Sequence, residues 1–131
     1  MNTTLSGIVF EQPDICAALD GLSDAELDKL AFGVIGFDAE TLVRRYNAIE
    51  SQMAGLAPAR VLGSALFTAV APCMNNFLVA QRFEDAVAEG VALDAMLDYV
   101  FTLRMRPSKV QLRLAASPST AMRYVLVQRR T

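Results

Sequence analysis

The chain has 131 residues, of which 53% are hydrophobic and 20% charged, which is enough apolar material for one domain with one core. Its formal net charge is -2, and the basic residues are dispersed apart from a short cluster at residues 128–131, which argues against nucleic acid as the main partner. No histidine is present, so Ser-His and Cys-His nucleophile pairs and the usual zinc ligand sets are excluded.

The expected location is the cytoplasm, without membrane contact. No apolar run approaches the roughly 20 residues of a spanning helix, and the first residues lack the basic start and apolar stretch of a secretory signal. Cys16 and Cys73 are expected to be free thiols, because a cytosolic protein rarely keeps a disulfide.

The first third of the chain predicts a helical segment followed by a hairpin. Residues 14–29 are expected to be helical with a break near residues 20–21, and Ser23 with Glu26 forms a capping-box pattern. Residues 31–37 alternate bulky and small side chains, as in a strand packed on both sides, and residues 42–46 predict its hairpin partner.

The middle of the chain predicts helical structure. Gly55, Pro58, Gly63 and Pro72 interrupt residues 47–73, which indicates short helical turns over a core. Residues 76–90 predict one longer helix that ends at Gly90. Its expected apolar stripe comprises Phe77, Ala80, Phe83 and Val87.

The remaining residues predict three strands, at 95–105, 110–114 and 122–127. The order of elements indicates an α+β domain with a central five-stranded antiparallel sheet, helices on one face, and additional N-terminal helices. We expect one domain over residues 1–131, with an N-terminal helical cap at about 11–30 and a core at about 31–131.

Four segments, in order, resemble the photoactive yellow protein family of the PAS domain superfamily. They are residues 27–33 (LDKLAFG), 46–50 (YNAIE), 70–73 (VAPC) and 105–110 (MRPSKV). The second is similar to the family's Tyr-Asn-Ala-Ala-Glu segment, and the third matches its chromophore-attachment sequence. Each fragment is short, but four in register are specific.

The resemblance implies a blue-light photoreceptor rather than an enzyme. Cys73 would carry p-coumaric acid as a thioester, Tyr46 and Glu50 would bond its phenolic oxygen, and Phe101 and Met105 would lie near its ring. Light would isomerise the chromophore, and the signal would pass to an unknown downstream protein. We expect a monomer or a weak dimer and no metal.

The chemistry of these residue types agrees with those roles. A helix beginning after Cys73 would favour its thiolate, and burial would keep Glu50 protonated. Once Glu50 passed its proton to the chromophore, its carboxylate would be buried and unpaired, at a cost of several kcal/mol. We expect the fold to relax by local opening that includes the N-terminal helices.

The sequence also departs from the family. Ala54 replaces a threonine of the phenolate network, Leu56 replaces an arginine over the pocket, and Leu103 replaces a tyrosine. Without that cation we expect a weaker hold on the phenolate and a pocket closed by apolar side chains.

Two alternatives remain. The chain could be a PAS sensory or protein-interaction module without a chromophore, as the changes at Ala54 and Leu56 favour. A thiol-dependent enzyme built on Cys73 has less support, because no histidine can serve as its base. By residue type alone, Cys73 is a small hydrophobe, and Glu50 a solvated carboxylate.

Overall fold

A computed structural model describes residues 8–102 and 107–129 of the chain. Two short helices, α1 (Ile15–Asp20) and α2 (Asp24–Leu27), precede the hairpin of β1 (Gly33–Phe37) and β2 (Val43–Tyr46). The helical middle contains α3 (Ala48–Ala54), α4 (Pro58–Val61), a π-helical turn (Leu66–Val70), a 3-10 turn (Pro72–Met74) and α5 (Ala80–Glu89). The chain then forms β3 (Leu93–Phe101), β4 (Ser108–Ala116) and β5 (Arg123–Arg129).

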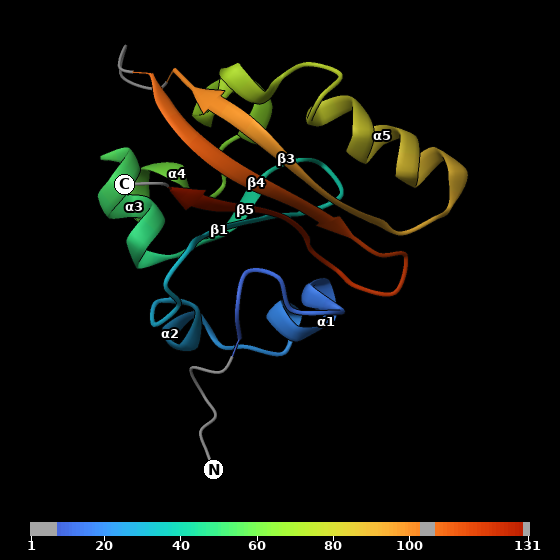
Figure 1. The fold of residues 1–131 in the computed structure, drawn as a ribbon, viewed down its shortest axis with the longest axis horizontal. Helices are drawn as coiled ribbons and strands as arrows, with labels where there is room; N and C mark the ends of the chain where they lie inside the picture. The colour runs from blue at the N-terminus through green and yellow to red at the C-terminus, as the bar shows by residue number, and fades with distance from the viewer. Residues whose placement is uncertain (1–7, 103–106, 130–131) are drawn as a thin grey trace.

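The strands form one antiparallel sheet in the order β2-β1-β5-β4-β3 (Figure 1). Gly33 of β1 pairs with Val127 of β5, and Ile35 pairs with Tyr46 of β2. This register brings the beginning of β1 beside the end of β5. The expected α+β class, the five-stranded antiparallel sheet and the β1–β2 hairpin are confirmed.

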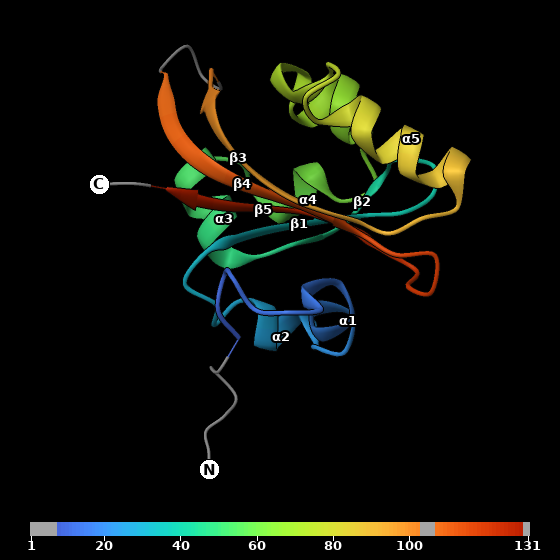
Figure 2. The same ribbon diagram turned by 45° about the vertical axis from the view of Figure 1, so that its right-hand side comes forward.

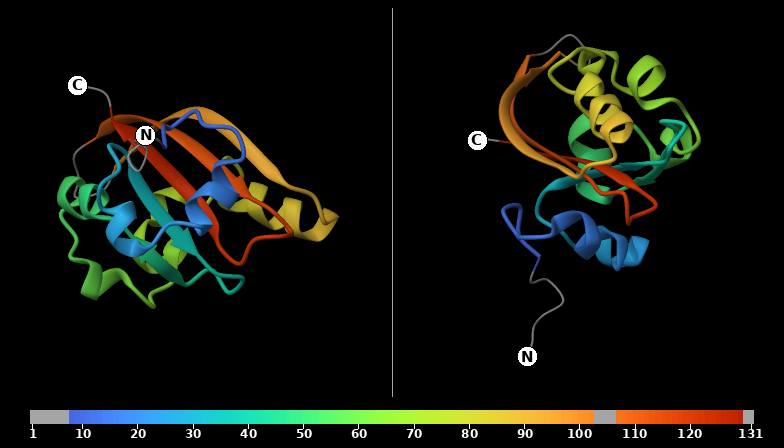
Figure 3. Two further views of the ribbon diagram at one scale, coloured as in Figure 1. Left: turned by 90° about the horizontal axis from the view of Figure 1, so that it is seen from below. Right: turned by 90° about the vertical axis from the view of Figure 1, so that its right-hand side faces the viewer.

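Different helices cover the two faces of the sheet (Figures 2 and 3). We call the face under α4 and α5 the helical face, and the face under α1 and α2 the cap face. Every residue of β1 is buried, as the prediction of a strand packed on both sides requires. Alternate residues of β5 supply the two cores: Val125 and Val127 face the helical side, whereas Tyr124 and Leu126 face the cap.

Hydrogen bonds and apolar contacts hold the N-terminal segment to the cap face. Arg113 of β4 donates to the carbonyls of Phe10 at 2.7 Å and Gln12 at 2.8 Å. Arg45 of β2 bonds the carbonyls of Leu19, at 2.8 Å, and Leu22. These bonds give side-chain donors to main-chain carbonyls of the N-terminal segment, where the Leu19 carbonyl also accepts from the Leu22 amide at 3.0 Å.

The predicted capping box is confirmed. The Ser23 hydroxyl accepts from the Glu26 amide at 3.1 Å, and the Glu26 carboxylate accepts from the Ser23 amide at 2.8 Å. The short turns expected between residues 47 and 73 are also present.

The predicted helix at 76–90 begins too early. Asn76 holds a turn ahead of α5, since its side-chain oxygen accepts from the amides of Leu78 at 3.0 Å and Val79 at 3.1 Å. Phe77 therefore lies outside the helix and is 80% exposed, so the predicted apolar stripe is wrong at that position. It is also wrong at Val87, which is exposed.

The strand predicted at 95–105 corresponds to β3, which spans Leu93–Phe101. Leu103 and Met105, at the end of that prediction, lie outside the described residues. Among the residues that the structure describes, no helix is both long and apolar enough to cross a membrane.

Candidate functional site

The junction of β2 and α3 places two of the predicted site residues next to each other. Tyr46 is the last residue of β2, and Glu50 lies in the first turn of α3. Asn47 between them is the N-cap, and its side-chain oxygen accepts from the Glu50 amide at 3.3 Å. Both predicted residues are buried, and Glu50 is only 1% exposed.

Asn47 also connects this junction to the cap. Its side-chain oxygen accepts from the amide of Val34 at 2.9 Å, while its side-chain nitrogen donates to the carbonyls of Leu27 and Phe32, each at 3.0 Å. The same buried side chain thus bonds α3, β1, the last residue of α2 and the segment that follows α2. A displacement of α3 would therefore disturb the attachment of the cap.

Glu50 is paired with a cation from the far end of the chain. Nη1 and Nη2 of Arg129 lie 2.7 and 3.1 Å from Oε1 and Oε2 of Glu50. Gly33 leaves room for the carboxylate, since an added Cβ at this position would overlap Oε1. Burial raises the pKa of the Glu50 carboxyl, and the hydrogen bonds and charge of Arg129 oppose that shift.

Glu50 is therefore paired in this structure, while the expectation of an unpaired carboxylate after proton release to a chromophore stays a prediction. The Arg129 side chain that meets it is 15% exposed, so water screens the pair only partly. Sequence reasoning missed this contact, because Arg129 lies 79 positions from Glu50.

Tyr46 lies in the same electrostatic environment. Burial raises the pKa of its hydroxyl, the charge of Glu50 raises it further, and Arg129 lowers it. Tyr46 is thus held as a neutral phenol, able to donate a hydrogen bond. No other described residue forms a hydrogen bond with this hydroxyl.

Cys73 lies in the 3-10 turn Pro72–Met74 and is partly exposed. It packs against the core of the helical face, to which Tyr46 and Phe101 belong. Its carbonyl accepts from the hydroxyl of Tyr99 at 2.6 Å and from the side-chain amide of Asn76 at 3.2 Å. Because α5 begins only at Ala80, the expected helix N-terminus directly after Cys73 is wrong.

Successive contacts connect Cys73 with Glu50. The ring of Tyr99, bonded to the Cys73 carbonyl, meets the ring of Phe101 edge to face with centroids 6.0 Å apart. The guanidinium of Arg129 lies 5.9 Å from the centroid of Phe101, within the range of a cation–π contact. Arg129 then bonds Glu50. The site thus contains a thiol, an aromatic wall and a buried acid–cation pair.

The structure also places the positions where the sequence departs from the family. Ala54 is buried at the end of α3, and Leu56 is partly buried against the core of the helical face. The predicted ring contact Met105 falls outside the described residues. Cys16 is buried among the side chains of the cap face, where its Sγ lies 3.2 Å from the Thr120 hydroxyl.

Two residues beyond the predicted set contribute to the site. Neither Arg129 nor Tyr99 belongs to a recognisable motif. The alternation of side chains along the last strand could, however, have indicated Arg129. Val125, Val127 and Arg129 share one face of β5, so Arg129 is a charged residue continuing an apolar row. Among the described residues, no group of three or more Cys, Asp and Glu could hold a metal ion.

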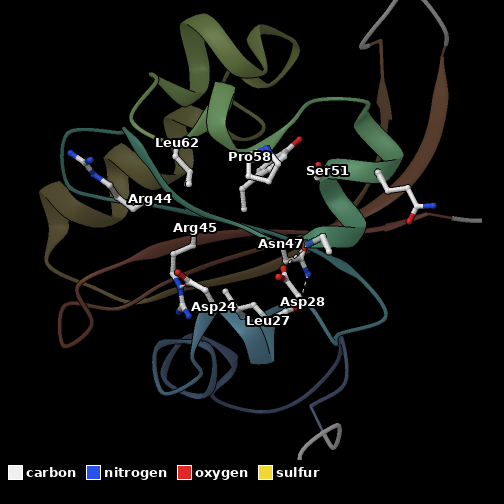
Figure 4. A pocket seen from close by; sticks show the side chains of 12 residues that line it. Asp24, Leu27, Asp28, Arg44, Arg45, Asn47, Ser51, Pro58 and Leu62 are labelled. Atoms are coloured by element: carbon white, nitrogen blue, oxygen red, sulfur yellow. Dashed lines mark hydrogen bonds and ion pairs between the residues drawn. The ribbon is translucent and has the colours of Figure 1, made fainter.

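A cleft lined in part by Tyr46 lies where β2, α2 and α3 meet (Figure 4). Its volume is about 460 Å³. Arg45 reaches across one end to Asp24 at 3.1 Å, and Asp28 accepts from the Ala48 amide at 2.7 Å. Its lining contains neither Cys73 nor Glu50, so it shares only Tyr46 with the predicted site residues.

No family model matches the chain. The chain is 36% identical over 122 residues to the photoactive yellow protein of Rhodothalassium salexigens, a match that covers 93% of this chain and 97% of that protein. Its structure is similar to the photoactive yellow protein domain of the sensor histidine kinase Ppr from Rhodospirillum centenum, with a TM-score of 0.78, 38% identity, and coverage of 86% and 98%.

A more distant neighbour shows the fold alone. The PAS domain of nitrogen regulation protein NR(II) from Vibrio parahaemolyticus is 14% identical, with a TM-score of 0.59 and coverage of 84% of this chain and 99% of that domain. The expected fold and family are thus confirmed: the chain has a PAS fold and belongs to the photoactive yellow protein family.

Proposed function

We propose that this chain is a blue-light receptor that carries p-coumaric acid as a thioester on Cys73. The observation that carries the proposal is the succession of contacts from the main-chain carbonyl of Cys73 through Tyr99, Phe101 and Arg129 to Glu50. It lies in a chain whose relatives are photoactive yellow proteins. Cys73 is a free cysteine and a partly exposed residue, while Glu50, at the acid end of the site, is buried.

The residues present fit such a group. Attachment requires the Cys73 thiolate to form a bond to the acyl carbon of an activated p-coumaric acid, while the bond from that carbon to its leaving group breaks and the leaving group departs with the electron pair. Tyr46 supplies a hydroxyl that no other described residue binds, and Glu50 supplies a buried carboxyl. Phe101 is buried and would offer an apolar wall, and the buried Ala54 and the partly buried Leu56 would add apolar surroundings.

The chromophore, when bound, supplies light absorption and isomerisation of its double bond. The protein's part is to hold and move a proton. Tyr46 would donate a hydrogen bond toward the phenolic oxygen, and Glu50 in its protonated form would donate another and then release its proton. The resulting charge on Glu50 would shift α3, and Asn47 would transmit that shift to the cap through its bonds to Leu27 and Phe32.

We expect the output to reach a signalling partner, because the similar domain in Ppr comes from a sensor histidine kinase. An exposed cap that opens would change the surface offered to such a partner.

Mixing the purified protein with p-coumaric anhydride tests the proposal. A yellow adduct is expected with the parent and with Cys16→Ala, and none with Cys73→Ala. Cys16 is the matched control because its thiol is buried on the opposite face of the sheet. A colourless adduct on Cys73, or no adduct in the parent, would favour the second function below.

The second candidate function is a PAS sensory or protein-interaction module without a chromophore. The observation that favours it is the pairing of Glu50 with Arg129, which gives the buried acid a partner within the protein. Ala54 and Leu56, which supply no polar group, point the same way.

A further inference from the structure

We infer that Arg129 is the charged positioning residue of this site: it sets the ionisation of Glu50 in the free protein and serves as the cation for the phenolate when the chromophore is attached. The second half of this inference rests on the proposed function, whereas the first half concerns the free protein alone.

Arg129 and Glu50 form a bidentate ion pair. The two terminal nitrogens of Arg129 bond the two carboxylate oxygens of Glu50, which strengthens the interaction and fixes the orientation of both side chains. The flat guanidinium also lies over Phe101, the predicted neighbour of the chromophore ring. Arg129 therefore touches both the acid and the aromatic wall of the site.

Other arginines on the adjoining strands are directed elsewhere. Arg45 bonds Asp24 and main-chain carbonyls of the cap, and Arg44 pairs with Asp38. Arg123, at the opposite end of β5, bonds the Asp38 carbonyl at 3.5 Å. Among the described residues of these strands, Arg129 is the arginine that meets Glu50.

This assignment changes the expected energetics of the site. A guanidinium keeps its charge at any accessible pH, so it compensates a negative charge on Glu50 or on a neighbouring phenolic oxygen, whichever lacks the proton. The cation absent at Leu56 is thus supplied from β5. After proton release, Glu50 would remain beside a positive charge, which reduces the drive toward opening of the cap.

The first experiment uses the free protein and needs no chromophore. Carbon-13 NMR of the glutamate carboxyl groups would follow the titration of Glu50 in the parent, in Arg129→Gln and in Arg123→Gln. Removal of Arg129 is expected to increase the proton affinity of Glu50 at least about tenfold. Arg123→Gln is the matched control, because it removes the same charge from the same face of the same strand, far from Glu50.

The second experiment titrates the absorbance of the adduct formed with p-coumaric anhydride. Arg129→Gln is expected to increase the proton affinity of the phenolate at least about tenfold relative to the parent and to Arg123→Gln. Arg129→Lys, which keeps the charge but not the bidentate pair, is expected to fall between them. If Arg129→Gln does not fold, the comparison of Arg129→Lys with the parent tests the inference in its place.

The outcomes separate the two proposals. If Glu50 titrates alike in the parent and in the Arg129 variants, the inference is overturned whether or not a chromophore binds. If Glu50 responds but no coloured adduct forms, the proposed function fails while Arg129 is still assigned to Glu50. If the adduct forms and its absorbance titrates alike in the parent and in the Arg129 variants, the proposed role of Arg129 toward the phenolate is overturned.

Discussion

The two faces of the sheet differ in how many hydrogen-bond partners their buried polar side chains have. On the cap face, Arg113 bonds two carbonyls and Asp94, and the Tyr124 hydroxyl lies between Asp20 and Arg45. On the helical face, Glu50 relies on one arginine, and no other described residue bonds the Tyr46 hydroxyl. A saturated network of hydrogen bonds rigidifies a fold. We therefore expect the stability of the cap face to depend on its polar network, whereas the helical face is the one on which we propose the site.

The largest expected effect comes from breaking the cap-face network. Arg113→Met is expected to lower the free energy of unfolding by about 2–3 kcal/mol, since the carbonyls of Phe10 and Gln12 lose their donor, while the half-exposed Asp94 can be hydrated. Urea denaturation of the parent and the variant measures this change in the free energy of unfolding. Arg44→Met, which breaks an exposed pair with Asp38, is the control and is expected to cost much less, because water screens this pair. Equal losses in both variants would contradict the contrast.

The next effect tests the fit of Glu50 on the helical face. Gly33→Ala is expected to lower the free energy of unfolding by about 1–3 kcal/mol, because its Cβ would overlap Oε1 of Glu50 and force the carboxylate or β1 to move. Gly21→Ala is the control, since a Cβ there meets no atom closer than 3.6 Å. A stability unchanged by Gly33→Ala, in the same denaturation assay, would show that Glu50 is not tightly held.

Thiol reactivity provides a third comparison of the faces. Iodoacetamide is expected to alkylate Cys73 at least about tenfold faster than Cys16, because burial raises the pKa of the Cys16 thiol and removes it from solvent. Mass spectrometry of time points from Cys16→Ala and Cys73→Ala gives the two rates. Faster modification of Cys16 would mean that the cap opens more readily than the site.

The smallest expected effect is a difference in pH dependence between two glutamates. Burial raises the pKa of Glu50, so its contribution to stability is fully present below its ordinary value of 4.5 and is lost as pH rises through its pKa in the folded state. Hydrogen bonds with Ser23 lower the pKa of Glu26 in the cap, so its contribution is present above 4.5 and is lost as pH falls.

Denaturation of Glu50→Gln and Glu26→Gln over a pH series checks these signs. Relative to the parent, Glu50→Gln is expected to gain stability as pH rises through this window, and Glu26→Gln to lose it. Slopes of the same sign would contradict the assignment of opposite environments to the two carboxyls.

Local patterns in the sequence were sufficient for much of the fold. The capping box at Ser23, the fully buried β1 and the hairpin depend on neighbours within a few positions, so periodicity and residue type revealed them. The start of α5 was not accessible in this way. Asn76 bonds Tyr99 at 2.6 Å and also the Cys73 carbonyl, and these tertiary contacts hold the preceding turn out of the helix.

The sequence alone determined the α+β class, the order of the strands along the chain, and, through its resemblance to known motifs, the residues from which a chromophore site would be built. Only the tertiary structure decided how the charge on that site is balanced. The partner of Glu50 depends on the register of β5 against β1. This register places Arg129 beside the Glu50 carboxylate, although the two residues are 79 positions apart in the sequence. Pairing between distant strands follows from the packing of the whole sheet, so no local pattern contains it.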